Sequence, residues 1–166
     1  MVAAIFFALA VAAAVPAEHH IRSGDARIQH ILVQGLEQSP TLHRLVEALD
    51  RSDVIVYIDE QQRLPALGGY LSHRVVALGG VRYLRVKLNS TGPISRVTAV
   101  LAHELQHALE VAQVAEARDL ASLQQLFEKV GLAAACEQEG CFETRAARDV
   151  EHEVQGEMTR FRRPVR

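Results

Sequence analysis

The feature that most constrains this chain is the stretch His103-Glu104-Leu105-Gln106-His107, which lies inside an apolar run from Val97 to Val114. Two histidines four residues apart on a helix project from the same face, one turn above the other. This spacing lets both imidazoles reach one tetrahedral zinc ion, and it puts the glutamate beside a water on that ion. The pattern therefore predicts His103 and His107 as zinc ligands and Glu104 as the general base.

The residues around the motif indicate a helix that is buried nearly all round. Two histidines and two glutamates on such a helix need polar partners, and a metal ion would supply them. The alternative interpretation is a core helix whose histidines are hydrogen-bonded to neighbouring groups. The apolar residues that carry this inference are Val97, Ala99, Val100, Leu101, Ala102, Leu105, Ala108, Leu109 and Val111.

A third protein ligand is required, because two histidines do not hold zinc tightly. We favour Glu143, which lies four residues before Ala147 on the apolar stripe of a helix predicted from about Phe142 to Phe161. An unpaired carboxylate on that stripe would be costly. Glu143 also falls in the first turn of this predicted helix, where a carboxylate is favourable, so a plain helix-start glutamate is the alternative. The other candidates after His107 are Glu110, Gln113, Glu116, Glu151, His152 and Glu153, of which His152 falls on the solvated side and Glu151 and Glu153 flank the stripe.

Glu110 lies on the same helix face as the two histidines. At about 1.5 Å per residue, its Cα lies about 7.5 Å along the axis beyond the midpoint of the two, too far to reach the same ion without strain. Glu110 is therefore interpreted either as a group that orients His107 or as a surface acid.

Length and charge limit the classes of protein and partner that we expect. The chain has 166 residues, 49% of them hydrophobic and 23% charged, which suits a single globular domain. Its net charge is −2, and no basic stripe with interleaved aromatic residues is present, so nucleic acid is not an expected partner.

The first 17 residues are predicted to be a signal peptide, followed by one domain over residues 18–166. Val2 to Val15 is an unbroken apolar run, and the small residues Val15 and Ala17 suit cleavage before Glu18. This predicts a secreted or periplasmic protein with no stable membrane span after cleavage. No Lys or Arg precedes the apolar run, so an uncleaved N-terminal helix, anchoring or buried, is the alternative.

Cys136 and Cys141 enclose a short polar loop. In an oxidising compartment this pair could close a local disulfide, and two free thiols are the alternative.

The rest of the chain predicts an α+β domain. Helices are expected from Asp25 to Gln38, then over the residues after the Ser39-Pro40-Thr41 break, and from Ala115 to Val130, ended by Gly131. Strands are expected at Val54–Asp59, Ser72–Leu78 and Val81–Leu88, the last two joined as a hairpin at Gly79-Gly80. We expect a small antiparallel sheet of about three strands packed against the motif helix and further helices.

The motif at 103–107, followed 36 positions later by Glu143 in the segment Phe142-Glu143-Thr144-Arg145-Ala146-Ala147, resembles a gluzincin metallopeptidase of the minimal single-domain kind. The resemblance covers roughly residues 81 to 155. It implies a peptidase in which the two histidines and a glutamate from a later helix bind zinc. It also implies that an edge strand binds an extended peptide, for which Val81–Leu88 and Ser72–Leu78 are the candidates. No residue can be matched to the Tyr or His that stabilises the oxyanion in many gluzincins.

The leading hypothesis is thus an exported zinc-dependent peptidase with a peptide or protein substrate. A metal-binding or interaction protein on the same scaffold, without turnover, is the second. A helical structural protein in which the motif is coincidental is the third.

Overall fold

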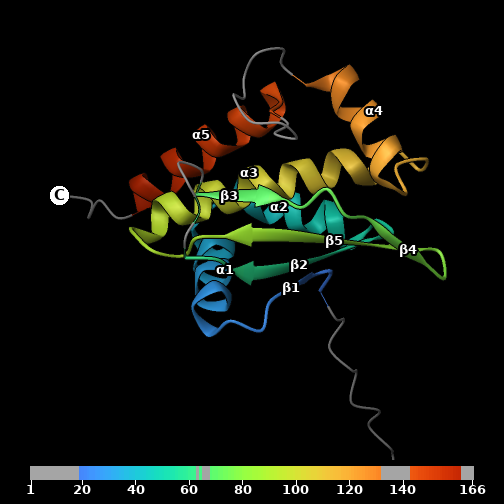
Figure 1. Cartoon of the computed structure of the whole chain (residues 1–166). Helices are drawn as coiled ribbons and strands as arrows, with labels where there is room; N and C mark the ends of the chain where they lie inside the picture. The colour runs from blue at the N-terminus through green and yellow to red at the C-terminus, as the bar shows by residue number, and fades with distance from the viewer. Residues whose placement is uncertain (1–18, 63, 65–67, 132–142, 162–166) are drawn as a thin grey trace, which may run out of the picture.

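Five strands pair into one sheet in the computed structural model, which describes residues 19–62, 64, 68–131 and 143–161 (Figure 1). The strands are β1 (Ile21–Arg22), β2 (Val54–Glu60), β3 (Gly69–Leu71), β4 (Val76–Leu78) and β5 (Val81–Leu88). The helices are α1 (Ala26–Gln38), α2 (Pro40–Asp50), α3 (Ile94–Ala112), α4 (Leu120–Val130) and α5 (Arg145–Phe161). The α+β class is as expected.

The sheet is mixed, so the expectation of about three antiparallel strands is wrong. Its order is β1-β2-β5-β3, with β4 also paired to β5. Strand β2 runs parallel to β5, from Val54 opposite Arg82 to Glu60 opposite Leu88, and β1 runs parallel to β2. A parallel return needs a long crossover, and residues 61–80 provide it. The pairing of β2 with β5 joins segments far apart in the chain, and β1 has only two residues. Neither feature produces a periodic pattern of apolar residues from which it could be predicted.

The second edge of the sheet is formed by β3 and β4, which both pair antiparallel with β5. Leu71 lies opposite Val86 and Val76 opposite Tyr83, so the residues 72–75 face only two residues of β5 and the edge bulges there. Gly79 and Gly80 both have positive φ, as the predicted tight hairpin requires. The hairpin is therefore confirmed, but the expected strand from Ser72 is shortened to Val76–Leu78.

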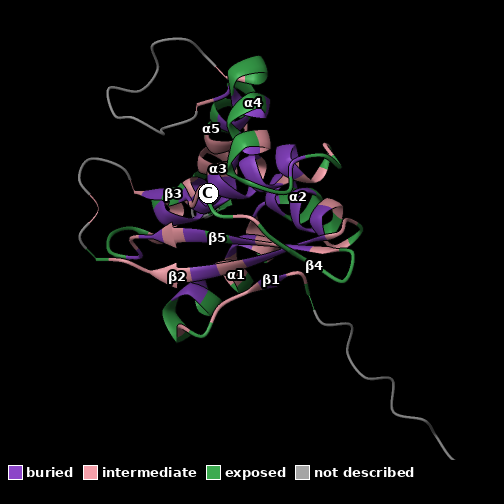
Figure 2. Ribbon diagram, turned by 45° about the vertical axis from the view of Figure 1, so that its right-hand side comes forward, coloured by how far each residue is buried: buried purple, intermediate pink, exposed green. Residues whose placement is uncertain are grey.

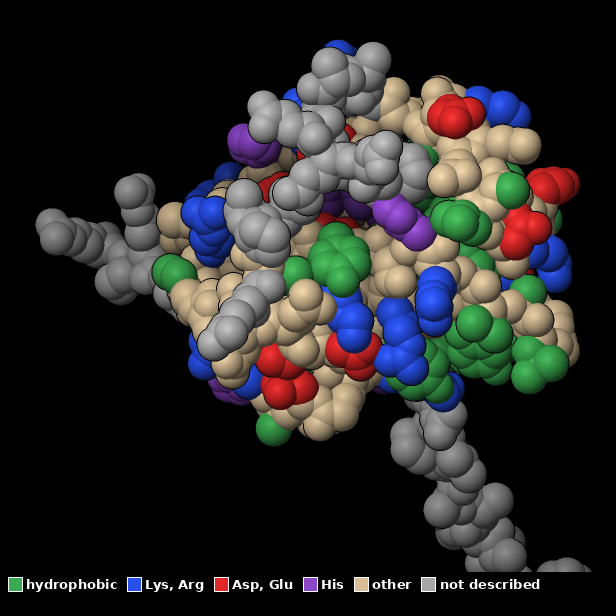
Figure 3. All heavy atoms as spheres, viewed as in Figure 1, with side chains coloured by type: hydrophobic (Ala, Val, Ile, Leu, Met, Phe, Trp, Pro, Cys, Tyr) green, Lys and Arg blue, Asp and Glu red, His purple; other side chains and the backbone are tan. Residues whose placement is uncertain are grey.

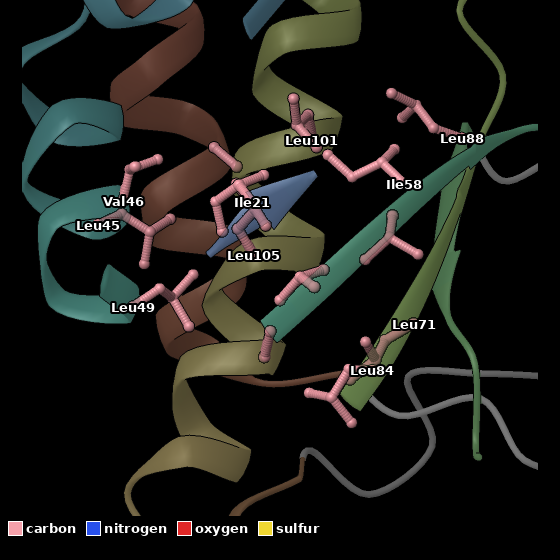
Figure 4. Packing of buried hydrophobic residues seen from close by; sticks show 14 of the residues in the cluster. Ile21, Leu45, Val46, Leu49, Ile58, Leu71, Leu84, Leu88, Leu101 and Leu105 are labelled. Carbon is pink, nitrogen blue, oxygen red and sulfur yellow. The ribbon is translucent and has the colours of Figure 1, made fainter. Parts of the chain in front are cut away.

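Helices α2 and α3 pack on one face of the sheet, and α1 and α5 pack on these two helices (Figures 1 and 2). The core between the layers joins apolar side chains from each of them. Figure 4 shows side chains of α2, α3 and the sheet that point toward one another, among them Leu49, Leu105 and Leu84. The opposite face of the sheet carries Tyr57 and Tyr83, and Lys and Arg side chains gather over this part of the sheet in Figure 3.

Capping residues set the helix ends. Asp25 accepts hydrogen bonds from the first turn of α1, and Ser39 caps α2 through the Leu42 N–H, as expected. Asp119 and Ser122 form a reciprocal capping box, so α4 begins at Leu120 and not at Ala115. The last helix begins at Arg145, because Thr144 Oγ1 accepts a hydrogen bond from the Ala147 N–H, 3.1 Å away, in the manner of an N-cap.

Two expectations lie outside the described residues: the signal peptide at 1–17 and the Cys136–Cys141 disulfide. Within the described ranges, no helix combines the length and the apolar character needed to cross a bilayer.

Arg82 holds the C-terminal end of α3 against the sheet. Its side chain is 1% exposed, and its guanidinium donates to both carboxylate oxygens of Asp53 at 2.9 and 2.6 Å. These hydrogen bonds lower the pKa of Asp53. The same guanidinium donates to the carbonyl oxygens of Val111, Ala112, Val114 and Ala117 at 2.7 to 3.3 Å. The carbonyls at and beyond the end of α3 are thus satisfied by one buried side chain.

Arg82→Met should lower the free energy of unfolding by about 3 kcal/mol, because it leaves several carbonyl groups and Asp53 without their donor. Urea denaturation followed by circular dichroism measures this change. The control is Arg85→Met in the same strand, where an exposed ion pair with Asp59 is removed at a cost below about 1 kcal/mol. Equal losses in the two variants would contradict the role given to Arg82.

Candidate metal centre

The two histidines of the motif lie side by side on α3, as their spacing predicts. Their Nε2 atoms are 3.2 Å apart, and the side chains of His103 and His107 are 13% and 4% exposed. The Phe127 ring of α4 packs edge-on against the His107 ring, with centroids 5.5 Å apart. This apolar contact, together with the burial of α3, keeps the His107 imidazole in a fixed position.

Glu143 reaches the histidines from the other side of the site. Its Oε1 lies 3.6 Å from His103 Nε2, and its side chain is 17% exposed. Glu143 precedes α5, so its expected position in the first turn of the helix is wrong. Two contacts hold its carboxylate: the Thr144 N–H donates to Oε1 at 2.9 Å, and Arg148 Nε lies 3.4 Å from Oε2. The approach of Glu143 to the paired imidazoles agrees with the prediction.

One ligand atom from each of His103, His107 and Glu143 lies within 4.8 Å of the other two. Nitrogens that are each about 2.1 Å from a tetrahedral zinc lie about 3.4 Å apart. The observed separations of 3.2 Å between the histidines and 3.6 Å to the carboxylate are close to that figure. The three side chains therefore converge closely enough to face one small cation.

The outer nitrogens of both rings are hydrogen-bonded to carboxylates. Glu151 Oε2 lies 2.9 Å from His103 Nδ1, and Glu110 Oε2 lies 2.9 Å from His107 Nδ1. A carboxylate accepts, so each Nδ1 carries the proton and, in a neutral ring, each Nε2 presents a lone pair. Two lone pairs 3.2 Å apart repel unless a proton or a metal ion lies between them. This donor set fits a divalent cation held by imidazoles whose orientation is set by carboxylates.

Glu110 also connects α3 to the start of α5. Its second oxygen accepts a hydrogen bond of 2.7 Å from Thr144 Oγ1, and Thr144 is 2% exposed. Thr144 is adjacent to Glu143 and caps α5, so one buried chain of hydrogen bonds joins His107, Glu110, Thr144 and the end of the ligand-bearing segment. Of the two interpretations of Glu110, the structure supports the group that orients His107 and not the surface acid.

The pKa values of His103 and Glu104 are both raised, for different reasons. Burial alone would lower the pKa of His103, but the hydrogen bond with Glu151 and the charges of Glu104, Glu143 and Glu151 outweigh it and raise this pKa. Burial also raises the pKa of Glu104, against the opposing charges of His103 and His107. A buried carboxyl with a raised pKa beside two imidazoles is suited to exchange a proton.

Glu104 lies against the edge strand β3. A Cβ on Gly69 would come within 3.2 Å of Glu104 Cγ, and the backbone of Leu71 hydrogen-bonds the Glu104 carboxylate. A side chain at position 69 would have to push its neighbours back by a few tenths of an ångström, so glycine favours this close approach of β3 to α3. The Glu104 carboxyl is thus positioned directly beside the backbone of the sheet edge.

Alternate peptide groups on β3 face away from β5. Gly68 O accepts from Asn89 of the chain after β5, and the Ser72 N–H donates to Arg85, so residues 68 and 72 face β5. The groups of Gly69 and Leu71 consequently face the other side, where the Leu71 backbone hydrogen-bonds the Glu104 carboxylate. Of the two predicted edge candidates, Val81–Leu88 is an interior strand, and the edge is formed by β3 and β4.

Sequence reasoning did not assign a role at the site to Glu151 or Thr144, which both contact it in the structure. Glu151 was placed beside the stripe, yet it lies on the row Glu143, Ala147, Glu151 at four-residue spacing, which was the available signal. The available signal for Thr144 was its residue type, because threonine is typical of helix caps. The candidates Gln113, Glu116, His152 and Glu153 are exposed to solvent.

No family model, curated protein or solved structure matches this chain.

Glu104→Gln should stabilise the metal-free protein at neutral pH. Since burial raises the pKa of Glu104 above its ordinary value of 4.5, folding favours the protonated carboxyl, and stability is lost as pH rises through the folded-state pKa. The amide removes this loss, so the variant should be more stable than wild type at pH near 7.5, with the difference vanishing below the unfolded pKa. Urea denaturation in the presence of chelator measures both conditions. The control Glu128→Gln, on the exposed surface of α4, should change stability by less than about 0.5 kcal/mol.

Thr144→Val should destabilise the metal-free protein by about 2 kcal/mol, because it leaves Glu110 Oε1 without its donor and removes the cap of α5. Thr144→Ser keeps the hydroxyl and serves as the matched variant. Thermal and urea unfolding of both proteins compare them. A valine variant as stable as the serine variant would refute the buried chain of hydrogen bonds.

Proposed function

We propose that this chain is an exported zinc-dependent peptidase. The observation that carries the proposal is the convergence of His103, His107 and Glu143 ligand atoms within 4.8 Å, with both imidazoles oriented by carboxylates. Three protein ligands with one position left open are typical of catalytic zinc sites, whereas structural sites close with four. The proposal also accounts for the buried lone-pair contact between the two Nε2 atoms.

Zinc bound by these three residues would polarise a water and the carbonyl of the substrate. Glu104 would take the proton from that water and pass it to the nitrogen of the leaving amine. Its burial and raised pKa support this exchange, because a raised pKa makes the carboxylate a stronger base and brings its pKa closer to neutral pH, where it can both take up and return a proton.

The open edge of β3 would bind the substrate backbone. The peptide groups of Gly69 and Leu71 face away from β5 beside Glu104, so a chain added to this edge would take over the Leu71 hydrogen bond from the Glu104 carboxylate and pass in front of the general base. Substrates are therefore expected to be extended peptides or mobile segments of proteins. The apolar N-terminal run from Val2 to Val15 supports export as part of the same proposal.

A second candidate is a zinc-binding protein without turnover on the same scaffold. One observation favours it: the Glu104 carboxylate is hydrogen-bonded to the backbone of Leu71 and is not directed only toward the ligand cluster. The test must therefore measure metal binding and hydrolysis separately.

The test compares wild type with Glu143→Ala and Glu104→Gln. Wild type should contain one zinc per chain by elemental analysis and cleave unstructured peptides in a chelator-sensitive manner. Glu143→Ala should lose roughly 100-fold or more in zinc affinity, since removal of a ligand exceeds the loss of an outer partner. Glu104→Gln should keep its zinc while hydrolysis collapses.

The outcomes separate the candidates. Zinc in wild type without hydrolysis of any peptide selects the binding protein. Zinc retained at full affinity by Glu143→Ala refutes the ligand set. Loss of zinc from Glu104→Gln would mean that Glu104 is a ligand and that the roles are wrong.

A further inference from the structure

A cavity of about 220 Å³ opens at the N-terminal end of α3, where Val100, one helical turn before Glu104, is one of its walls. Its walls combine the apolar side chains of Val97 and Val100 with the polar groups of Arg96, Asn89 and Thr91, and Gly68 closes it on the side of the sheet edge. This volume is far above the ~10–15 Å³ that one water requires. The cavity is therefore large enough for a side chain of a bound peptide.

The helix face that lines the cavity continues along α3 to Glu104. Arg96, Val100 and Glu104 are spaced four residues apart on α3, so their side chains follow one face of the helix. A Cβ on Gly69 would come within 3.1 Å of Val100 and 3.2 Å of Glu104, which places both beside the start of β3. At about 1.5 Å per residue, Arg96 lies about 12 Å along the helix from Glu104. An extended chain covers that distance in about three to four residues.

Arg96 is the cationic group of this cavity. Its side chain is exposed, and over the described residues its guanidinium takes part in no hydrogen bond or ion pair. Its charge is felt by Glu151, whose pKa is lowered by the hydrogen bond with His103 and, to a smaller extent, by Arg96. The other two polar wall residues are engaged with each other: Asn89 Oδ1 accepts from the Thr91 N–H at 2.9 Å and from the Thr91 hydroxyl, and Asn89 Nδ2 donates to Gln62 O at 3.2 Å. The guanidinium is thus the group left to recognise a ligand.

The direction of the bound chain decides which part of a peptide enters the cavity. Antiparallel pairing is slightly more stable per residue than parallel pairing, so we expect the peptide to run opposite to β3. The cavity lies at Gly68, next to the first residue of β3, and the C-terminal part of an antiparallel peptide would lie there. The residues after the cleaved bond are consequently those nearest to Arg96.

We infer that this cavity recognises a carboxylate within the first three or so residues after the cleaved bond, with Arg96 as the specificity-determining residue. The inference rests on the proposed peptidase function and names its substrate class. A guanidinium and a carboxylate match in charge and in the geometry of paired hydrogen bonds. The carboxylate belongs either to an Asp or Glu side chain or to the free C-terminus of a short leaving peptide.

The test uses the zinc-loaded full chain and matched internally quenched peptides that carry Glu, Gln or Lys at each of the three positions after the cleaved bond. Each peptide is made with a free and with an amidated C-terminus. Wild type should prefer a carboxylate-bearing peptide over its neutral counterpart by about tenfold in kcat/KM. Arg96→Gln should abolish this preference, and Arg96→Glu should transfer it to the Lys peptides. A preference that follows Glu identifies side-chain recognition, and one that follows only the free C-terminus identifies recognition of the chain end.

Arg51→Glu is the matched control, because it makes the same change in charge on an exposed residue at the end of α2. It should keep the preference of wild type. Equal cleavage of all peptides by wild type, or a preference that survives in Arg96→Gln, would overturn the inference.

Failure of the proposed function is distinguishable from failure of this inference. If no peptide is hydrolysed, calorimetric binding of the same peptides to Glu104→Gln and to the double variant with Arg96→Gln decides the role of Arg96. About tenfold tighter binding of the carboxylate-bearing peptides, lost in the double variant, supports it. Equal binding by the two proteins overturns it.

Discussion

Burial of α3 between the sheet and α5 places His103, Glu104, His107 and Glu110 where water solvates them poorly. In such surroundings each polar group needs a partner, and a single missing partner costs as much as a typical hydrogen bond contributes, or more. The partners come from elements far apart in the chain: Leu71 of the edge strand, Thr144 before α5, and Glu151 within it. Because the contacts are mutual, the polar face of α3 determines how α5 and β3 are seated. The core fixes the layers, and these hydrogen bonds fix their relative position.

The fold could be predicted where local chemistry decides it. Asp25 and Ser39 mark helix starts, and Gly79-Gly80 marks the hairpin, because caps and tight turns depend on a few adjacent residues. The pairing of β2 with β5 could not be predicted, because it depends on which strand returns beside which after the crossover at 61–80. Strand β1 has only two residues, and its position is set by pairing to Val56 and Tyr57 and by burial of Ile21 in the core. The bulge at 72–75 also follows from the shape of the edge and not from a pattern in those residues.

The candidate site was predictable to the extent that its members share a helix. The spacing of His103, Glu104 and His107 is set by α3 alone, so the sequence contains it in full. The argument from burial predicts Glu143, which lies beside His103 in the structure, but its predicted local structure is wrong, since it precedes the cap and does not belong to the first turn. Glu151 lies on the same row of residues at four-residue spacing as Glu143, but its charge suggested a position exposed to solvent. Residues that act by orienting others are the hardest to predict, because their role depends on a distance across the fold and not along the chain.

The two ends of α3 are held in different ways, and this separates recognition from positioning. At the C-terminal end, Arg82 donates to four carbonyl groups at and beyond the end of the helix, and Glu110 anchors His107 to Thr144. In the middle, the histidines are fixed by carboxylates. At the N-terminal end, Arg96 projects into a cavity without a partner among the described residues. A change of charge there touches none of the hydrogen bonds that hold the helix in place. Arg96 lies about two helical turns before the histidines. The residue at this position could therefore change, and with it the ligand that the cavity recognises, while the geometry of the proposed zinc ligands stays constant.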